Sequence, residues 1–460
     1  DASKTTIEWL YSDEGKSVGA IYKTKWVNDQ TLYLMDMRLP KEDRSILKLD
    51  PESPEKMNPL FDKQRLADNL MSIVNRDDTT MYLDWPISFN SDGSYGLYLY
   101  EDDIFVLDIT AAEFLRITNT DSKEKSVRFS PDGKKIAFIR DNDLFTYSLN
   151  TKQEKRLTYN GSETLLNGTL SWVYWEEIFG RQDIGYWWSD DSKALAFLQT
   201  DESSVTKMHY VHWKPAEPKL ITQRYPKAGT ENPKVRLGVI ELNNPKVKWI
   251  KLEPFEYLCR VKWLPGNRRL SIQTMNRAQD KLDLYFVDRA TGKNIEKIIT
   301  ETDDGWVNIN DDLYFLKNSF IWQSERDGYA HLYQFSYNGK LVNQITSGDW
   351  ALRSSGGPFW LRQSVVNIDE KEEEIYFTSL KESSIERHLY RSSIDGSNIE
   401  KISDQKGVHK INFSNNGNFY LDIHSDATSP PTLVLYKNDG KKIHTLVGDR
   451  PEIISEYDLQ

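Results

Sequence analysis

The apolar and polar positions of this chain form a repeating unit of short strands. The clearest copy runs from Phe129 to Thr158. Its turn, Pro131-Asp132-Gly133, combines a residue that presets φ with one that accepts positive φ. The apolar run from Ile136 to Ile139 is typical of a strand buried on both faces. From Leu144 to Leu149 apolar and polar residues alternate, which is the period of a half-buried strand.

Eight stretches of the chain follow this pattern, and several end in Ile-Thr or Leu-Thr. They begin at Trp26, Phe89, Phe129, Trp188, Trp263, Phe320, Ile375 and Phe413, at spacings of about 40 to 75 residues. Four-stranded propeller blades repeat at about 40–45 residues, and insertions lengthen some of them. The pattern therefore predicts an all-β fold, an eight-bladed β-propeller over residues 25–447. A row of stacked sandwich domains is the alternative, but it would lack a common motif in each unit.

The remaining segments have separate assignments. Residues 1–24 are expected to be a lead-in, and residues 448–460 the start of a linker to a hydrolase domain absent from this chain. Two segments have a helical pattern: Glu55 to Asn75, and a short turn carrying Glu176 and Glu177 in a loop inserted before the fourth unit.

Composition narrows the classes of function. The 460 residues carry a net charge of −11 with scattered Lys and Arg, so a nucleic-acid partner is not expected. No apolar run reaches the roughly 18 residues that span a bilayer. Because Cys259 is the only cysteine, an intrachain disulfide and a zinc site of paired cysteines are excluded. No metal or cofactor is expected. The chain opens without Met, so we expect a removed export signal and a periplasmic or secreted location.

The most unusual stretch is Ser171 to Gly180, where Glu176 and Glu177 stand among large aromatic residues. Adjacent carboxylates are usually solvated surface groups. Apolar neighbours change this, because a carboxylate at low dielectric needs a cationic partner or a raised pKa. A pair on one helical turn can grip a substrate ammonium. The competing interpretation is an ion pair with a neighbouring cation such as Arg181.

The segment Trp172 to Phe179, Trp-Val-Tyr-Trp-Glu-Glu-Ile-Phe, resembles a signature of the propeller domain of the dipeptidyl peptidase IV family, within the prolyl oligopeptidase clan of serine peptidases. The resemblance implies that Glu176 and Glu177 bind the free α-ammonium of a peptide substrate. Trp172 and Tyr174 are the expected supporting aromatics.

Further matches extend over nearly the whole chain. Tyr225 to Gly229 resembles the family's Tyr-Pro-Lys-Ala-Gly segment, and Glu386 to Tyr390 resembles the form seen in bacterial members. A bacterial member is therefore the expectation. The family often holds the other end of the substrate with a propeller arginine, but no Arg stands between Leu97 and Asp103. Substrate recognition beyond the ammonium is left open.

The catalytic half of such an enzyme is expected to be absent. A serine hydrolase of this class needs Gly-x-Ser-x-Gly at a strand-to-helix elbow, followed by Asp and His. The chain has no alternating strand and helix pattern, so we expect neither that domain nor its motif. Gly93-Ser94-Tyr95-Gly96 has the wrong spacing.

The resemblance then implies a serine dipeptidyl aminopeptidase for the full-length protein, with this part binding the substrate ammonium and gating access. This fragment alone should be inactive. Its expected partners are peptides with a free N-terminus and the missing α/β-hydrolase domain, with homodimerisation of the full-length protein as a further expectation. One alternative is a non-catalytic propeller that binds peptides or proteins. Another is a propeller glycosidase, which would need converging carboxylates at about 5–9.5 Å; the sequence shows no such group.

Overall fold

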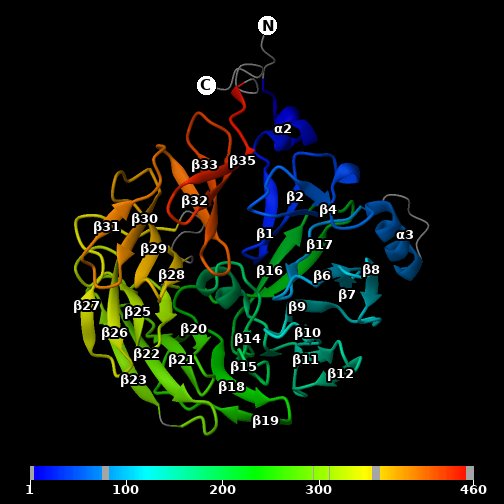
Figure 1. The fold of residues 1–460 in the computed structure, drawn as a ribbon. Coiled ribbons are helices and arrows are strands. Elements are labelled where there is room, and N and C mark those ends of the chain that lie inside the picture. The colour runs from blue at the N-terminus through cyan, green and yellow to red at the C-terminus, as the bar shows by residue number, and fades with distance from the viewer. Residues whose placement is uncertain (1–4, 75–81, 294, 310, 355–362, 452–460) are drawn as a thin grey trace. The chain divides into compact units, whose positions relative to one another are not determined.

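The computed structural model describes residues 5–74, 82–293, 295–309, 311–354 and 363–451. The chain has the all-β, eight-bladed β-propeller fold, as predicted. Figure 1 labels its helices and strands along the chain. It divides into two compact units. The first comprises Asp1–Tyr98, Val106–Arg116 and Asn310–Gln460, and the second comprises Leu99–Phe105 and Ile117–Ile309.

In its described residues, the first unit contains four helical segments and four complete sheets. Its helical segments are α1 (Ile7–Tyr11), α2 (Asp13–Val18), η1 (Lys41–Asp43) and α3 (Lys63–Val74). The first sheet joins β1 (Tyr22–Asn28), β2 (Thr31–Asp36), β3 (Leu47–Leu49) and β4 (Met57–Pro59). The later sheets are β24 (Leu313–Phe315), β25 (Ser319–Ser324), β26 (His331–Ser336) and β27 (Leu341–Gln344); β28 (Val365–Asp369), β29 (Glu374–Ser379), β30 (His388–Ser393) and β31 (Ile399–Lys401); and β32 (Val408–Phe413), β33 (Phe419–Ser425), β34 (Thr432–Lys437) and β35 (Lys442–Val447).

The second unit contains three sheets and a separate two-stranded ribbon. The sheets are β9 (Glu124–Phe129), β10 (Lys135–Arg140), β11 (Asp143–Ser148) and β12 (Gln153–Arg156); β13 (Leu165–Asn167), β14 (Tyr186–Trp188), β15 (Ala194–Asp201), β18 (Lys234–Glu241) and β19 (Asn244–Trp249); and β20 (Tyr257–Trp263), β21 (Arg269–Met275), β22 (Lys281–Asp288) and β23 (Glu296–Thr302). The ribbon pairs β16 (Lys207–His212) with β17 (Lys219–Arg224). A further sheet, β5 (Ser88–Phe89), β6 (Tyr95–Tyr100), β7 (Asp103–Asp108) and β8 (Glu113–Arg116), has residues in both units.

One predicted helix has a different start. The sequence pattern placed it from Glu55, but the structure has β4 there and α3 begins at Lys63. The side chain of Asp62 accepts the backbone N–H groups of Gln64 and Arg65, at 2.9 and 3.2 Å, which satisfies the free donors of the first turn. Asn75, the predicted end, lies outside the described residues.

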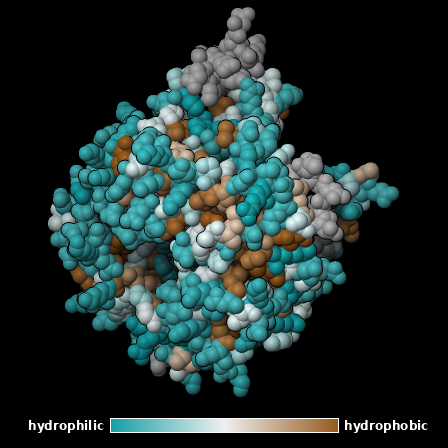
Figure 2. All heavy atoms as spheres, turned by 45° about the vertical axis from the view of Figure 1, so that its right-hand side comes forward, coloured by the Kyte–Doolittle hydropathy of each residue, from teal (hydrophilic) through white to brown (hydrophobic). Residues whose placement is uncertain are grey.

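The strands bury apolar side chains as the pattern indicated. In β10 the run from Ile136 to Ile139 is fully buried, and in β15 the run from Ala194 to Leu198 is as well. Part of both strands belongs to one core cluster of the second unit, which also contains Tyr186 and Trp188. On the face drawn in Figure 2, most of the surface is hydrophilic, with apolar patches between.

Within the first unit, the earliest and latest sheets pack on each other. Leu32 and Leu34 of β2 share a core cluster with Leu433 and Leu435 of β34. The indole Nε1 of Trp26 donates to the carbonyl of Asn412 at 3.1 Å. Strands from early and late in the chain therefore form one apolar layer.

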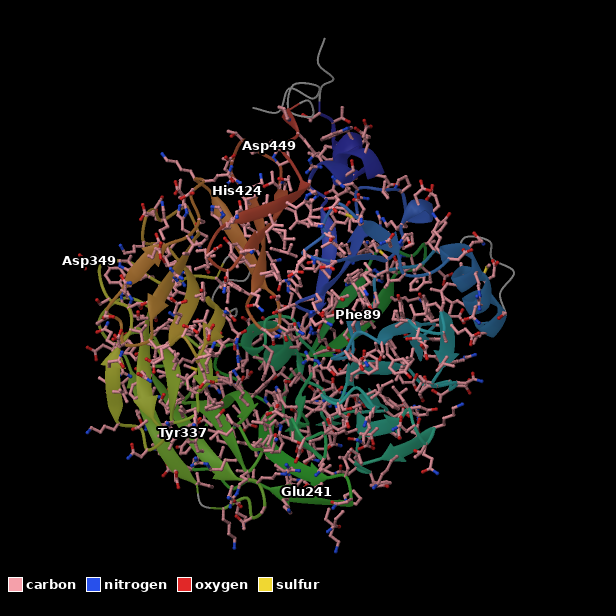
Figure 3. All side chains as sticks on the ribbon, viewed as in Figure 1. Phe89, Glu241, Tyr337, Asp349, His424 and Asp449 are labelled. Atoms are coloured by element: carbon pink, nitrogen blue, oxygen red, sulfur yellow. The ribbon has the colours of Figure 1, made fainter. Side chains whose placement is uncertain are left out.

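Three buried histidines follow one another across the last two sheets. The ring centroids of His388 and His409 are 5.3 Å apart, and those of His409 and His424 are 4.8 Å apart. His424 lies on β33, and Asp449 follows β35; both are labelled in Figure 3. His409 Nδ1 lies 2.7 Å from Asp422 Oδ2, and its Nε2 lies 2.8 Å from the carbonyl of Gln405. Since both partners are acceptors, this geometry fits the doubly protonated ring.

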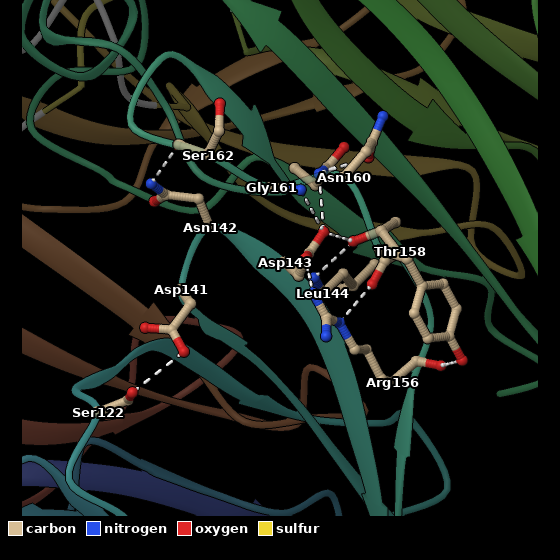
Figure 4. A network of polar contacts seen from close by, with 12 residues as sticks. Ser122, Asp141, Asn142, Asp143, Leu144, Arg156, Thr158, Asn160, Gly161 and Ser162 are labelled. Carbon is tan, nitrogen blue, oxygen red and sulfur yellow. Dashed lines mark hydrogen bonds and ion pairs between the residues drawn. The ribbon is translucent and has the colours of Figure 1, made fainter.

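The closing threonine of the repeat has a structural role. Thr158 Oγ1 accepts the N–H of Leu144 at 2.9 Å and donates to Asp143 Oδ1 at 2.6 Å (Figure 4). Arg156 Nη2 donates to the second oxygen of Asp143 at 2.5 Å. Corresponding contacts join Thr300 with Asp283, Thr346 with His331, and Ser403 with His388. The hydroxyl thus satisfies polar groups where the third strand begins, which explains why the unit ends in Ile-Thr or Leu-Thr.

Candidate functional site

The two glutamates lie on a single turn of π-helix, η2 (Tyr174–Ile178), in the loop between β13 and β14. The sequence predicted this helical turn. The N–H of Phe179 bonds to the carbonyl of Tyr174 at 2.8 Å, and the N–H of Arg181 bonds to the carbonyl of Trp175 at 2.7 Å. Gly180 and Arg181 both have positive φ, 58° and 65°. Two successive left-handed residues end the turn and reverse the chain.

Buried aromatic side chains anchor this turn to neighbouring strands. Tyr174 is fully buried, and its hydroxyl accepts the N–H of Leu258 in β20 at 3.1 Å. Burial raises the pKa of Tyr174 far above its usual value, so the phenol stays neutral. The ring of Phe179 lies 6.1 Å from that of Trp187 in β14. The turn is therefore fixed to two strands of the second unit.

A residue that the sequence analysis did not single out, Arg260 of β20, supports the end of the turn. Its Nη1 donates to the carbonyl of Ile178 at 2.9 Å, and its guanidinium lies 5.2 Å from the ring of Phe179. This contact joins residues 82 positions apart. The alternation of β20 could mark Arg260 as a strand residue, but no sequence signal joins it to the glutamates.

The two carboxylates have different surroundings. Glu176 is 23% exposed in its side chain, and Arg181 holds both of its oxygens. Glu177 is exposed, and among the described residues it has no ion-pair partner. The hydrogen bonds that Arg181 donates to Glu176, together with the charge of that carboxylate, raise the pKa of Arg181. The competing interpretation from the sequence, an ion pair with Arg181, thus applies to Glu176, while Glu177 remains open to solvent.

The two predicted supporting aromatics have different positions. Tyr174 is inside the fold and supports the backbone. Trp172 is half-buried, and its ring centroid lies 4.4 Å from that of Tyr225 at an interplanar angle of 50°. Tyr225 opens the Tyr-Pro-Lys-Ala-Gly segment that also carries the resemblance. Two motifs that are 53 positions apart (225 − 172) therefore meet beside the turn.

One expectation from the sequence was wrong. The spacing Gly-x-Ser-x-Gly does occur once, at Gly15 to Gly19. The structure places Ser17 in the short helix α2, where its hydroxyl donates to the carbonyl of Glu14 at 2.7 Å. A nucleophile elbow requires a strand before the serine and a helix after it. Because helix α1 precedes α2, this serine lacks that setting.

Within the described part of the chain, no group of three or more His, Cys, Asp or Glu side chains has a geometry that could hold a metal ion. Its helices are also too short or too polar to cross a membrane.

Comparison with known proteins identifies the family. A family model described as the dipeptidyl peptidase IV (DPP IV) N-terminal region matches residues 88–431. The chain belongs to the dipeptidyl peptidase IV family. The predicted relationship is therefore confirmed, and the matched part of the DPP IV family is its N-terminal region.

Curated relatives are fungal dipeptidyl peptidases. "Probable dipeptidyl peptidase 4" of Arthroderma benhamiae is 27% identical over 384 residues, which cover 78% of this chain and 47% of the relative. "Probable dipeptidyl-aminopeptidase B" of Emericella nidulans is 28% identical over 393 residues, covering 77% of this chain and 42% of the relative. The chain spans about half the length of the curated relatives it matches.

Solved structures have the same fold. The crystal structure of Porphyromonas gingivalis dipeptidyl peptidase 4 matches with a TM-score of 0.80 at 23% identity. The match covers 99% of this chain and 64% of the Porphyromonas gingivalis chain. A putative dipeptidyl aminopeptidase IV from Bacteroides ovatus matches with a TM-score of 0.76 at 20% identity. This match covers 97% of this chain and 63% of the Bacteroides ovatus chain. At these identities the likeness is one of fold.

Proposed function

We propose that this chain binds the free N-terminal ammonium of peptide substrates at Glu176 and Glu177. In the longer protein it would gate access to a hydrolase domain that acts as a serine dipeptidyl peptidase. The chain itself would lack the catalytic triad. The observation that carries the proposal is the pair of adjacent carboxylates on an anchored turn, one of them without an ion-pair partner among the described residues.

The chemistry of the turn suits an ammonium group. A peptide N-terminus offers three N–H donors and a positive charge. Two carboxylates offer acceptors and negative charge, and hydrogen bonds to charged groups contribute about 1.5–3 kcal/mol each. Because Glu177 is exposed, solvent screens its charge and reduces its contribution to the binding free energy. An acetylated N-terminus has no charge and one donor, so the pair would discriminate against it.

The anchoring contacts serve this role by limiting movement of the pair. A clamp that is already in place loses less conformational entropy when a ligand binds. The Tyr174 hydroxyl and the Arg260 guanidinium each join the turn to β20. We therefore assign these two side chains a positioning role.

Peptide binding by this chain tests the proposal. Calorimetric titration would compare the tripeptide Gly-Pro-Ala with its N-acetyl form. We expect the free peptide to bind more tightly, and Glu176→Gln and Glu177→Gln each to weaken its binding about tenfold or more. Glu231→Gln, at an exposed site of the same unit, is the matched control and should change nothing. Equal binding of the two peptides, or unchanged affinity in both variants, would contradict the ammonium clamp.

Release of Gly-Pro from a chromogenic substrate by the longer protein separates the enzyme from a non-catalytic peptide-binding propeller. Cleavage that is lost in the two glutamate variants supports the peptidase. Binding without cleavage favours the non-catalytic alternative.

The periplasmic or secreted location stays a prediction, as does the homodimer. The exposed Trp213 and Leu220, next to and within the ribbon β16–β17, are the first residues to replace in a sedimentation test of that homodimer.

A further inference from the structure

Arg181 occupies the carboxylate that an incoming ammonium would use. Its Nε lies 3.1 Å from both oxygens of Glu176, and its Nη2 lies 2.9 Å from Oε1. Two N–H donors on one carboxylate form the fork that arginine makes with carboxylates. The acceptor sites of Glu176 are therefore shared with a cation of the chain itself.

The backbone directs Arg181 toward this contact. It is the second of two residues with positive φ, and its N–H bonds to the carbonyl of Trp175 at 2.7 Å. A residue with a Cβ is uncommon in the left-handed region, whereas Gly180 adopts it readily. The hydrogen bond holds Arg181 in this conformation, so the chain reverses and its side chain returns to Glu176.

Arg181 is held less firmly than Glu176 in this ion pair. The side chain of Arg181 is 74% exposed, against 23% for Glu176. Glu176 is the one ion-pair partner of Arg181 among the described residues. Glu176 is part of the anchored turn, so its carboxylate stays in place when the guanidinium leaves. An exposed pair of this kind is weak, since water solvates both charges and the long side chain loses entropy in holding one geometry.

We propose that Arg181 is the resident counter-cation of Glu176, which competes with the substrate ammonium and so sets the affinity of the site for free N-termini. This inference rests on the proposed function. Glu177, which has no such partner, takes the ammonium first. The ammonium then displaces the guanidinium from Glu176 into solvent and completes its contacts with the pair. Arg181 is thus a residue that lowers affinity for the ligand, in contrast to the anchors Tyr174 and Arg260.

The test is a set of binding measurements with the tripeptide Gly-Pro-Ala on the 460-residue chain. Arg181→Gln should tighten binding roughly two- to fivefold, the range expected for release of an exposed ion pair. Arg181→Lys should have a smaller effect, because it keeps the charge and loses the fork. Binding of the N-acetyl peptide should not change. Arg269→Gln, which breaks the exposed pair with Glu296 in the same unit, is the matched control and should leave the affinity unchanged.

A double-mutant cycle separates competition from positioning. In the Glu176→Gln background, Arg181→Gln should no longer tighten binding, since the group competed for is gone. If Arg181→Gln weakens binding or leaves it unchanged while the glutamate variants weaken it, Arg181 positions Glu176 or has no role. The inference is then wrong and the ammonium clamp stands. If neither glutamate variant affects binding, the proposed function itself fails. Unchanged melting temperature of Arg181→Gln excludes a folding defect as the cause.

Discussion

Two carboxylate–cation pairs in this protein show how burial changes the role of the same chemistry. Glu176 and Arg181 lie on a surface turn of the second unit, with the cation 74% exposed. Asp422 and His409 lie on adjacent strands of the first unit, with side-chain exposures of 7% and 2%. The exposed cation can leave at little cost because water replaces its partner. The buried cation cannot leave without stranding a carboxylate in the fold.

The surroundings of the buried pair reinforce this difference. Both ring nitrogens of His409 face acceptors, the carboxylate of Asp422 and the carbonyl of Gln405. Burial by itself lowers the pKa of His409, but the hydrogen bond and charge of Asp422 outweigh it, so the net shift is upward. A cavity of about 370 Å³ borders both side chains. The exposed pair is suited to exchange its cation, whereas the buried pair is suited to hold its own.

The largest expected effect comes from removing the buried cation. His409→Leu leaves Asp422 charged, buried and unpaired, and breaking a buried pair in this way costs about 3–5 kcal/mol. We expect the free energy of unfolding in urea at pH 6 to fall by that amount. The double variant His409→Leu/Asp422→Leu should recover most of the loss, because no charge is then stranded.

His444→Asn, at a half-buried position of β35 in the same sheet, is the control for replacing a histidine. A loss below about 1 kcal/mol in His409→Leu would show that Asp422 is solvated, and the contrast between the two pairs would disappear.

A smaller effect is expected from the buried support of the exposed pair. Tyr174→Phe removes the acceptor for the N–H of Leu258, which becomes an unsatisfied buried donor at about 1–3 kcal/mol. Stability should fall by this amount, and binding of the free tripeptide should weaken because the turn loses one anchor. Tyr159→Phe, at an exposed phenol of the same unit that donates to the carbonyl of Arg156, is the control. If Tyr174→Phe lowers stability without affecting binding, the turn keeps its geometry without this contact.

The eight blades could be predicted from the sequence because each one repeats a local signal. A turn residue, an apolar strand and a closing Thr or Ser lie close together in the chain, as Asp132-Gly133, Ile136 to Ile139 and Thr158 do. The start of α3 was missed because Met57 to Pro59 pairs with β3 and Asp62 caps the helix afterwards. Strand pairing there overrode the helical pattern.

The site shows the same division between local and distant signals. Glu176, Glu177 and the competing Arg181 lie within six residues, so the sequence could bring them together. Arg260 and Leu258 reach the turn only through the fold, and nothing in the chain marks those contacts. The sequence also could not show which glutamate Arg181 would take. That choice follows from the reversal at Gly180, which returns the side chain to Glu176.

The smallest expected effect is a pH dependence that only the buried pair should have. The folded pKa of His409 is raised above its unfolded value, about 6.5. The pair's contribution is therefore complete below the unfolded pKa and is lost as pH rises through the folded pKa. We therefore expect the wild type to lose stability relative to His409→Leu/Asp422→Leu as the pH rises from 6 to 9. His388 and His424, which flank the ring, are present in both proteins. Arg181→Gln should show a flat difference over the same range, because the pKa of Arg181 is raised by its contact with Glu176 and the guanidinium keeps its charge there. A flat difference for the buried pair as well would mean that the charge of His409 does not contribute to the stability of the fold over this range. The buried contact would then be an ordinary hydrogen bond, and burial alone would distinguish it from the exposed pair.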